Sequence, residues 1–401
     1  MNPHDIDTRI TELWEGIPGA IGTARADLLM ELADHLMEAE RHTEALPVLE
    51  TAQELFAEAG TDWLVGRAAH NRGAVLGQLG RPDERLEAEL ESIGGYERGQ
   101  RRDLAGCSRM ALGIHLRSAG RLEEAAAAFR AAVEDFAAAN EMEHQGHAMV
   151  AVLEAEIDLG RLADAERLLQ PTLAAVAATA PIPVVAQVHQ LAALVLEVRC
   201  GPEAALHALR NARAVWDALN DDNEVATCDI RSAILNIDLE GPKAAVKLLL
   251  NLRPERQLFG DVAGVASCDR GLGLAALARR RPERALRHLE SAATVFQACA
   301  LFADAAECES LAATALAQVG RTCEAIDQLR RVAPTLATLD RPLAEMVARL
   351  TLADLLVSEG DVRRAAREAT RAASIARGAQ LPDELARARA LTAGASPHFP
   401  T

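Results

Sequence analysis

The stretch Gly120-Arg121-Leu122-Glu123-Glu124-Ala125 recurs along this 401-residue chain at multiples of forty residues. Further copies of its glycine turn stand at 80, 160, 320 and 360, and degenerate copies stand at 40, 200, 240 and 280. Glycine suits the end of a helix, where the chain enters a left-handed conformation that a Cβ atom disfavours. The stretch therefore predicts a turn between two helices that occurs nine times in the chain.

Residues at fixed distances from this turn are small or bulky in nearly every copy. The fifth residue after the turn is alanine in eight of nine copies, and the exception is Arg85. Leu112 and Leu116 lie eight and four residues before the turn, and Phe129 lies nine residues after it. Small residues let two helices approach closely, and the bulky ones rebuild a core layer every forty residues. We therefore predict an all-α solenoid of about nine helix-turn-helix repeats.

The repeat boundaries divide the chain into three parts. We expect residues 1–20 to form an N-terminal capping helix and residues 21–380 to form the nine repeats. Residues 381–401 are expected to form a C-terminal capping helix and a frayed tail. The array should be one elongated, right-handed superhelix of about twenty helices, each ~16 residues and ~24 Å long. Pro254 falls midway along a second helix and is expected to kink or end it.

The charge of the chain argues against some classes of partner. Its 42 basic and 59 acidic residues give a formal net charge of −17, which repels phosphate backbones and anionic membrane surfaces. We therefore expect no nucleic-acid and no membrane partner. The polar, acidic opening MNPHDIDTRITELW does not resemble a signal peptide, so we expect a soluble cytoplasmic protein.

The cysteines follow the same period as the turns. Cys228, Cys268 and Cys308 lie forty residues apart, in a slot whose other occupants include Ala68, Ser108, Ala148 and Ala348. We therefore predict that they are reduced, buried core residues and not a disulfide framework.

The sequence offers few groups for catalysis or for cofactor binding. The string Gly271-Leu272-Gly273-Leu274-Ala275-Ala276 matches a dinucleotide fingerprint, but it follows no strand and is interpreted as helix core. His144 and His147 have metal-ligand spacing without a placed third ligand, and are interpreted as solvated loop histidines. Asp221-Asp222-Asn223-Glu224 is interpreted as a helix N-cap. We predict a protein that is not an enzyme, with no catalytic residue, no metal and no cofactor.

The repeat pattern resembles the tetratricopeptide repeat family across nearly the whole chain. Leu112-Gly113, Ala125 and Phe129 match the family signature, as do Leu272-Gly273 and Ala285. The unit is forty residues long where the family has about 34, and most of the aromatic residues are missing. Long units of this kind resemble those of kinesin-light-chain-like scaffolds and of bacterial peptide-sensing regulators.

The resemblance implies that the first helix of each repeat lines a concave groove. In that register the groove is more apolar than an ordinary surface, and its centre is Leu194, Ile230 and Ile234. Two interpretations stay open at this point: adjoining helices or a partner subunit of a homo-oligomer cover the stripe, or a bound peptide or helix does. The predicted groove residues are Met110, Ile114, Val150, Glu154, Gln187, Gln190, Leu194, Val198, Ile230, Ile234, Arg270 and Leu274.

These observations predict an adaptor for protein-protein interaction, which holds a peptide or helix of another protein in its groove. The alternative is a sensor of a peptide or small ligand that changes the curvature of the superhelix and regulates a partner. The sequence does not separate the two.

Overall fold

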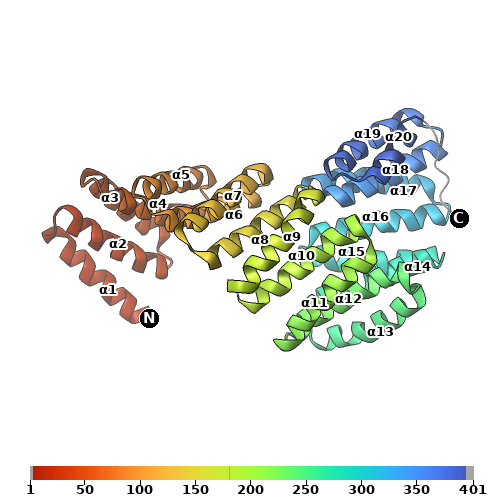
Figure 1. Cartoon of the computed structure of the whole chain (residues 1–401), viewed down its shortest axis with the longest axis horizontal. Helices are drawn as coiled ribbons and strands as arrows, with labels where there is room; N and C mark the ends of the chain where they lie inside the picture. The colour runs from red at the N-terminus through yellow and green to blue at the C-terminus, as the bar shows by residue number, and fades with distance from the viewer. Residues whose placement is uncertain (1–2, 180, 394–401) are drawn as a thin grey trace. The chain divides into compact units, whose positions relative to one another are not determined.

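The computed structural model describes residues 3–179 and 181–393 (Figure 1). In these ranges the chain forms twenty α-helices and one short 3-10 helix, and it contains no strand. The predicted all-α repeat class is therefore confirmed. The tail from residue 394, which we expected to be frayed, lies outside the described residues.

The helices follow one another in antiparallel pairs, and one pair forms one repeat. A cap of α1 (Pro3–Gly16) and η1 (Ile17–Gly19) precedes the first pair, and α20 (Pro382–Thr392) follows the last. The nine pairs are α2 (Gly22–Glu38) and α3 (His42–Glu58), α4 (Asp62–Gln78) and α5 (Pro82–Arg98), α6 (Arg102–Ser118) and α7 (Leu122–Ala139), α8 (Met142–Asp158) and α9 (Leu162–Thr179), α10 (Ile182–Cys200) and α11 (Pro202–Ala218), α12 (Asp222–Leu239) and α13 (Pro242–Leu258), α14 (Val262–Ala278) and α15 (Pro282–Ala298), α16 (Phe302–Gln318) and α17 (Thr322–Thr338), and α18 (Pro342–Ser358) and α19 (Val362–Gly378).

The same tight turn ends helices both inside and between repeats. Gly120 has a φ of 73°, and the next amide, that of Arg121, donates to the Leu116 carbonyl at 2.8 Å. This bond reaches back five residues and satisfies a carbonyl that the helix end leaves free. Between repeats, Asn140 and Ala300 adopt a similar left-handed conformation, with φ values of 58° and 59°. The turn therefore recurs every twenty residues, although only its copies inside the repeats are rich in glycine.

The small slots of the sequence are places of close helix contact. Ala125 is fully buried, as are most of its forty-residue equivalents. A Cβ added to Gly273 would lie 2.6 Å from Cγ of Leu289, and one added to Gly113 would overlap the ring of Phe129. In these two repeats the bulky residue of the second helix therefore fills the space that the glycine of the first helix leaves.

The repeats fall into two compact units, which meet inside α8 between residues 152 and 153. We expected one elongated domain, and nothing in the forty-residue period marks this boundary. In the first unit, Ile6, Ile10 and Leu13 of α1 are buried in one core cluster with side chains of α2 and α3. This contact gives α1 the position of a cap on the first repeat.

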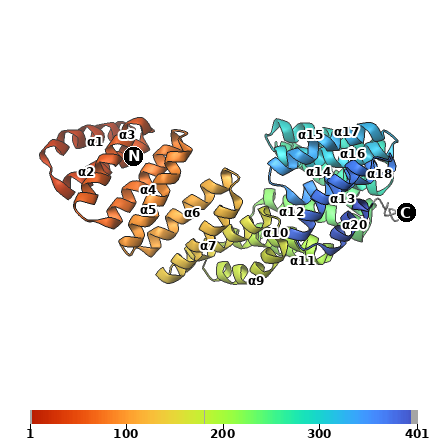
Figure 2. The ribbon, with the colours of Figure 1, turned by 90° about the horizontal axis from the view of Figure 1, so that it is seen from above.

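The second unit curves so that its two ends meet. Figure 2 shows the helices from α10 to α20 gathered in one curved array. The turn after α8 brings Gly160 against Pro342, which begins α18. Arg199, near the end of α10, donates from Nη1 to the Gln380 carbonyl at 3.0 Å, in the turn between α19 and α20. We call these two contacts the seam of the second unit.

Pro254 does not end its helix. Helix α13 continues through this proline to Leu258, and Pro47, Pro171 and Pro334 also lie inside helices. The expectation that Pro254 ends the helix was therefore wrong. Burial of Leu249, Leu252 and Arg256 on one face of α13 supplies the packing that holds the helix together through the proline.

The structure also tests three smaller predictions. Cys228, Cys268 and Cys308 are free and buried, as predicted, and burial raises the pKa of the last two thiols to about 12. The glycine-rich string from residue 271 lies within α14, in the core as expected. His144 lies in the first turn of α8 and not in a loop. Its ring stacks on the Phe136 ring, with 5.3 Å between the centroids.

Candidate functional site

The first helices of five successive repeats surround one cavity in the second unit. Helices α12, α14, α16 and α18 pack on one another in order, and α10 precedes them. Together they enclose a volume of about 470 Å³. It is lined by Leu194, Glu197, Arg231, Ile234, Leu235, Arg270, Leu274, Glu307, Ser310, Leu311, Leu343, Ala344 and Val347.

A second hollow of about 330 Å³ shares two of these residues, Leu194 and Arg231. It extends the concave surface to α8. Its other lining residues are Glu154, Gln187, Gln190, Leu191, Glu224 and Thr227. We call the two hollows together the inner groove.

The forty-residue period places equivalent side chains around the groove. Leu194, Ile234 and Leu274 lie forty residues apart, on α10, α12 and α14. Residues three or four apart share one face of a helix, so each helix adds a second and third side chain beside this position. The same repeat that builds the core therefore also builds a row of apolar side chains on the concave surface.

Two apolar side chains of the inner groove are well exposed to solvent. Leu194 is 42% exposed and Val347 is 51% exposed. Apolar surface in water carries a free-energy cost of about 25 cal/mol per Å², which a bound apolar group removes. The groove is therefore suited to cover by another apolar surface.

One cation of the groove is already paired. Arg270 Nη1 lies 3.0 Å from Asp304 Oδ1 and 3.4 Å from Glu307 Oε2, and its guanidinium lies over the Phe296 ring at 5.9 Å. Burial raises the pKa of the Glu307 carboxyl, and the charge of Arg270 opposes this effect. These contacts fix Arg270 against α16.

Two other charges line the 470 Å³ cavity without an ion pair among the described residues. Arg231 Nη1 donates only to the Gln190 carbonyl, at 3.4 Å, and burial lowers the pKa of its guanidinium. The Glu197 carboxyl is open to solvent inside the concave surface, where the surrounding protein raises its pKa by desolvation, and the positive charges of Arg231 and Arg270 oppose that rise. This cavity therefore presents one cation and one anion that are close enough to interact but do not touch, whereas Glu224 of the second hollow accepts a bond from Gln190 Nε2 at 2.8 Å.

The structure brings seven of the twelve predicted residues to the inner groove. These are Glu154, Gln187, Gln190, Leu194, Ile234, Arg270 and Leu274.

The other five predicted residues lie elsewhere. Ile230 and Val150 are buried, with 4% and 8% exposure, so our expectation that they face the groove was wrong. At their position, ten residues before the turn, the polar side chains of Gln190, Arg270 and Ser310 line the inner groove, whereas these two apolar side chains are buried. Met110 packs on a core cluster of the first unit. Ile114, in the first unit, and Val198, on α10, are exposed but do not line the inner groove.

Sequence reasoning missed the position one residue further along the helix. It is filled by Leu191, Arg231 and Leu311, which all line the groove. The two positions are 100° apart around the helix, so the inner groove takes side chains from both, whereas Val150 and Ile230 at the chosen position are buried. The forty-residue spacing of Leu191 and Arg231 was the sequence signal that could have identified this position.

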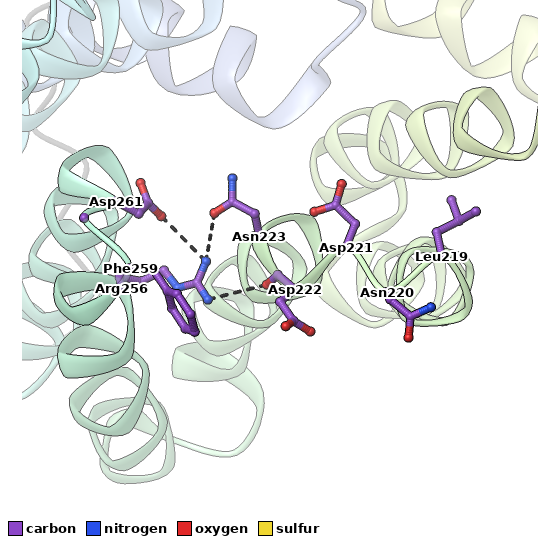
Figure 3. A pocket seen from close by; sticks show the side chains of 9 residues that line it. Leu219, Asn220, Asp221, Asp222, Asn223, Arg256, Phe259 and Asp261 are labelled. Atoms are coloured by element: carbon purple, nitrogen blue, oxygen red, sulfur yellow. Dashed lines mark hydrogen bonds and ion pairs between the residues drawn. The ribbon is translucent and has the colours of Figure 1, made fainter.

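Another pocket, of about 680 Å³, lies at the turns before α12 and α14 (Figure 3). Arg256 lies at its base, where Nη1 donates to Asn223 Oδ1 at 2.8 Å and lies 3.8 Å from Asp261 Oδ2. Asp221 and Asp261 accept bonds from backbone amides of α12 and α14, which confirms the predicted N-cap. Arg256 occupies the bulky slot that Phe296 fills in the next repeat. The polar groups of this pocket therefore bond with one another or cap a helix, and we interpret them as structural and not as a binding site.

Comparison with known proteins agrees with the repeat pattern. The family model of the tetratricopeptide repeat matches residues 24–98. Comparison with curated proteins finds no match.

Solved structures share the fold at low sequence identity. Aspartyl phosphate phosphatase F from Bacillus subtilis is 14% identical, and the match covers 84% of this chain and 95% of that chain with a TM-score of 0.57. The apo form of the quorum sensor NprR from B. thuringiensis is 10% identical over 82% of this chain and 98% of that chain, with a TM-score of 0.56. The repeats of a putative kinesin light chain from Podosopora anserina are 17% identical over 49% of this chain and 97% of that chain, with a TM-score of 0.41.

These similarities concern the fold alone. The predicted resemblance to the tetratricopeptide repeat family is confirmed by the family model and by the shared helical repeat fold.

Proposed function

We propose that the chain is a non-enzymatic adaptor whose inner groove holds a peptide or helix of a partner protein. The observation that carries this proposal is the single cavity lined by five successive first helices, in which exposed apolar side chains surround four charged ones. Apolar burial supplies affinity without direction, and a few charged groups fix the register of a bound segment. Repeats that present one face of each helix to a concave surface are suited to an extended ligand.

A sensor remains the second candidate, and the seam favours it. Gly160 and Arg199 contact residues near the other end of the second unit. A ligand that changes the curvature of this unit would therefore also change contacts outside the groove. Loss of the Arg199 contact on ligand binding, seen as faster amide exchange in α20, would support regulation of a partner.

We further propose that the chain acts in the cytoplasm. Because its net charge of −17 repels phosphate backbones and anionic surfaces, we also propose that it binds neither nucleic acid nor membranes. Helix α10 is long and apolar enough to cross a membrane by length and composition. In the structure this helix packs on α9 and α11 and supplies Leu194 to the groove, so we interpret it as a repeat helix.

The test replaces the two most exposed apolar groove residues. We would pan a display library of random fifteen-residue peptides against the chain and measure the affinity of the selected peptides for Leu194→Asp with Val347→Asp. We expect a loss of about 2 kcal/mol or more, roughly thirtyfold in affinity, because the charges would be buried under the ligand. Leu250→Asp is the matched control, since this leucine is 53% exposed on α13, a second helix.

Helicity of each variant is checked by circular dichroism. If the selected peptides bind the folded double variant as tightly as they bind the parent chain, the groove is not their binding site. Light scattering tests whether a second copy of the chain covers the inner groove. If the parent chain is a dimer and the double substitution dissociates it, the groove binds a partner subunit and not a peptide.

A further inference from the structure

We infer that the segment bound in the inner groove is dipolar: it carries a carboxylate that pairs with Arg231 and a cationic group that pairs with Glu197, between apolar residues. This inference rests on the proposed function and names the chemistry of its ligand.

The first step of the argument is the pairing of the groove's charges. The cavity is lined by two cations and two anions, which are Arg231, Arg270, Glu197 and Glu307. Arg270 and Glu307 contact each other, and Asp304 completes their cluster. Among the described residues, Arg231 and Glu197 form no ion pair with each other or with any other side chain. In this cavity the two charges open to a ligand are therefore one of each sign, and Glu224 of the second hollow already accepts a bond from Gln190 Nε2 at 2.8 Å.

The second step is the cost of covering these charges. A ligand that buries an ionised group without a partner removes its water and leaves the charge uncompensated, which costs several kcal/mol. The apolar neighbours of the two charges, Leu194 and Ile234, favour a ligand that excludes water from this place. A ligand with only one charge would compensate one group and leave the other buried alone. Only a ligand with both signs compensates both.

The third step is the geometry of the donor and acceptor. A guanidinium offers a planar set of N–H donors that matches the two oxygens of a carboxylate. Arg231 uses one of them for a long bond of 3.4 Å to the Gln190 carbonyl, which leaves the others for a ligand. Glu197 lies on α10 and Arg231 on the neighbouring first helix α12, so the ligand's cationic group should lie toward α10 and its carboxylate toward α12.

The occupant that fits is a peptide segment. The groove continues past Arg231 and Leu194 into the second hollow, whose lining includes Gln187, Gln190 and Thr227. Gln190 Nε2 already donates to Glu224 Oε2 at 2.8 Å, and Thr227 Oγ1 donates to the Asn223 carbonyl at 3.1 Å. The side-chain oxygens of both residues can still accept from the amides of a peptide backbone. The continuous concave surface therefore offers apolar, charged and backbone-binding groups in a row.

The experiment uses synthetic eight-residue peptides with acetylated and amidated ends, built on the apolar sequences that the display library selects. Four versions place Glu and Lys, Glu and Gln, Gln and Lys, or two Gln residues at the two central positions, in both orders. Fluorescence polarisation with the full chain measures each affinity. We expect the version with Glu and Lys in one order to bind about tenfold more tightly than the version with two Gln residues.

Charge-removing variants assign each preference to its residue. Arg231→Gln should abolish the preference for Glu and keep that for Lys, and Glu197→Gln should do the reverse. Arg213→Gln is the matched control: this arginine lies on α11 outside the groove, where it pairs with Asp229 at 2.8 Å, so its loss should change neither preference. Peptides with free ends and Gln at the centre test whether terminal charges supply the same chemistry.

The outcomes separate the two levels of the argument. If no peptide binds the parent chain, the proposed function fails and this inference fails with it. If apolar peptides bind but neither Arg231→Gln nor Glu197→Gln changes the preference among the charged and uncharged versions, the groove remains the binding site and the inference of a dipolar ligand is overturned. Equal weakening of all peptides by Arg231→Gln would also overturn it, because this result assigns the arginine to the packing of the groove.

Discussion

The two units use the same repeat to build different inner surfaces. The position six residues before the turn shows the contrast between the first repeat and the centre of the second unit. In the first repeat it is Asp34, which receives a bond from Asn71 at 2.8 Å and lies 3.3 Å from Arg67. In three successive repeats of the second unit it holds Leu194, Ile234 and Leu274, which line the inner groove.

This difference separates the residues that fold the repeat from those that give it a surface. Ala45 in the first unit and Ala285 in the second are both fully buried, so the core slots are common to both. The positions that face inward are not constrained by the core, and they differ. Binding is therefore expected in the second unit only.

The largest effect should come from the core that both units share. We expect Gly273→Ala and Gly113→Ala to destabilise the fold by about 1–3 kcal/mol each, because the new methyl group meets Leu289 or Phe129 in a filled core. Gly94→Ala is the control: its Cβ would meet only the flexible end of Arg98, so helix propensity should stabilise this variant by up to about 1 kcal/mol. Urea unfolding measures all three. Equal effects at Gly94 and Gly273 would contradict the role of the small slot.

A smaller effect is expected at the slot that Cys228, Cys268 and Cys308 fill in three repeats of the second unit. In one repeat of the first unit Ser108 fills this slot and bonds with Ser92 at 2.8 Å. Replacement of each cysteine by alanine should cost about 1 kcal/mol or less, as small core changes do.

Thiol labelling gives a second measure of this slot. In the native chain Cys107, Cys200, Cys299 and Cys323 are exposed and should react first, and the three buried thiols should react only in denaturant. Rapid labelling of seven thiols in the native protein would contradict the burial of this slot.

The smallest effect should come from the first unit's own counterpart of the groove. Ile114 occupies the position of Leu194 and Ile234 and is 58% exposed, yet it does not line the inner groove. We expect Ile114→Asp to change the affinity of selected peptides less than about twofold. A loss as large as that of the Leu194 and Val347 variant would extend the binding surface into the first unit and remove the contrast.

Much of the fold could be predicted from the sequence, because the core slots repeat along the chain. Gly120, Ala125 and Cys268 each lie at a fixed distance from a turn, and packing of neighbouring repeats alone determines their surroundings. The groove was predicted in part, since Leu194 and Ile234 face it and Ile230 does not. Which residue faces inward depends on the rotation of a helix about its axis, and a shift of one residue changes the face.

The division into two units and the charge arrangement could not be predicted. Unit boundaries and curvature depend on small rotations summed over several repeats, which no single position of the period records. Arg231 follows Glu197 by 34 residues, the separation that also joins Gln190 to Glu224 and Arg270 to Asp304 across neighbouring first helices. This separation differs from the period of forty, so it could be recognised only once the packing of the first helices was known.

The seam also limits how the second unit could evolve. Gly160 has a φ of 69°, and a Cβ there would lie 3.0 Å from Cγ of Pro342, so this glycine both ends α8 and admits the facing proline. Duplication or loss of one repeat between them would move Pro342 away from Gly160 and Gln380 away from Arg199. An open array tolerates such changes in length, because each repeat contacts only its neighbours. The repeat number of the second unit is therefore a fixed count, much as the number of strands is fixed in a closed barrel.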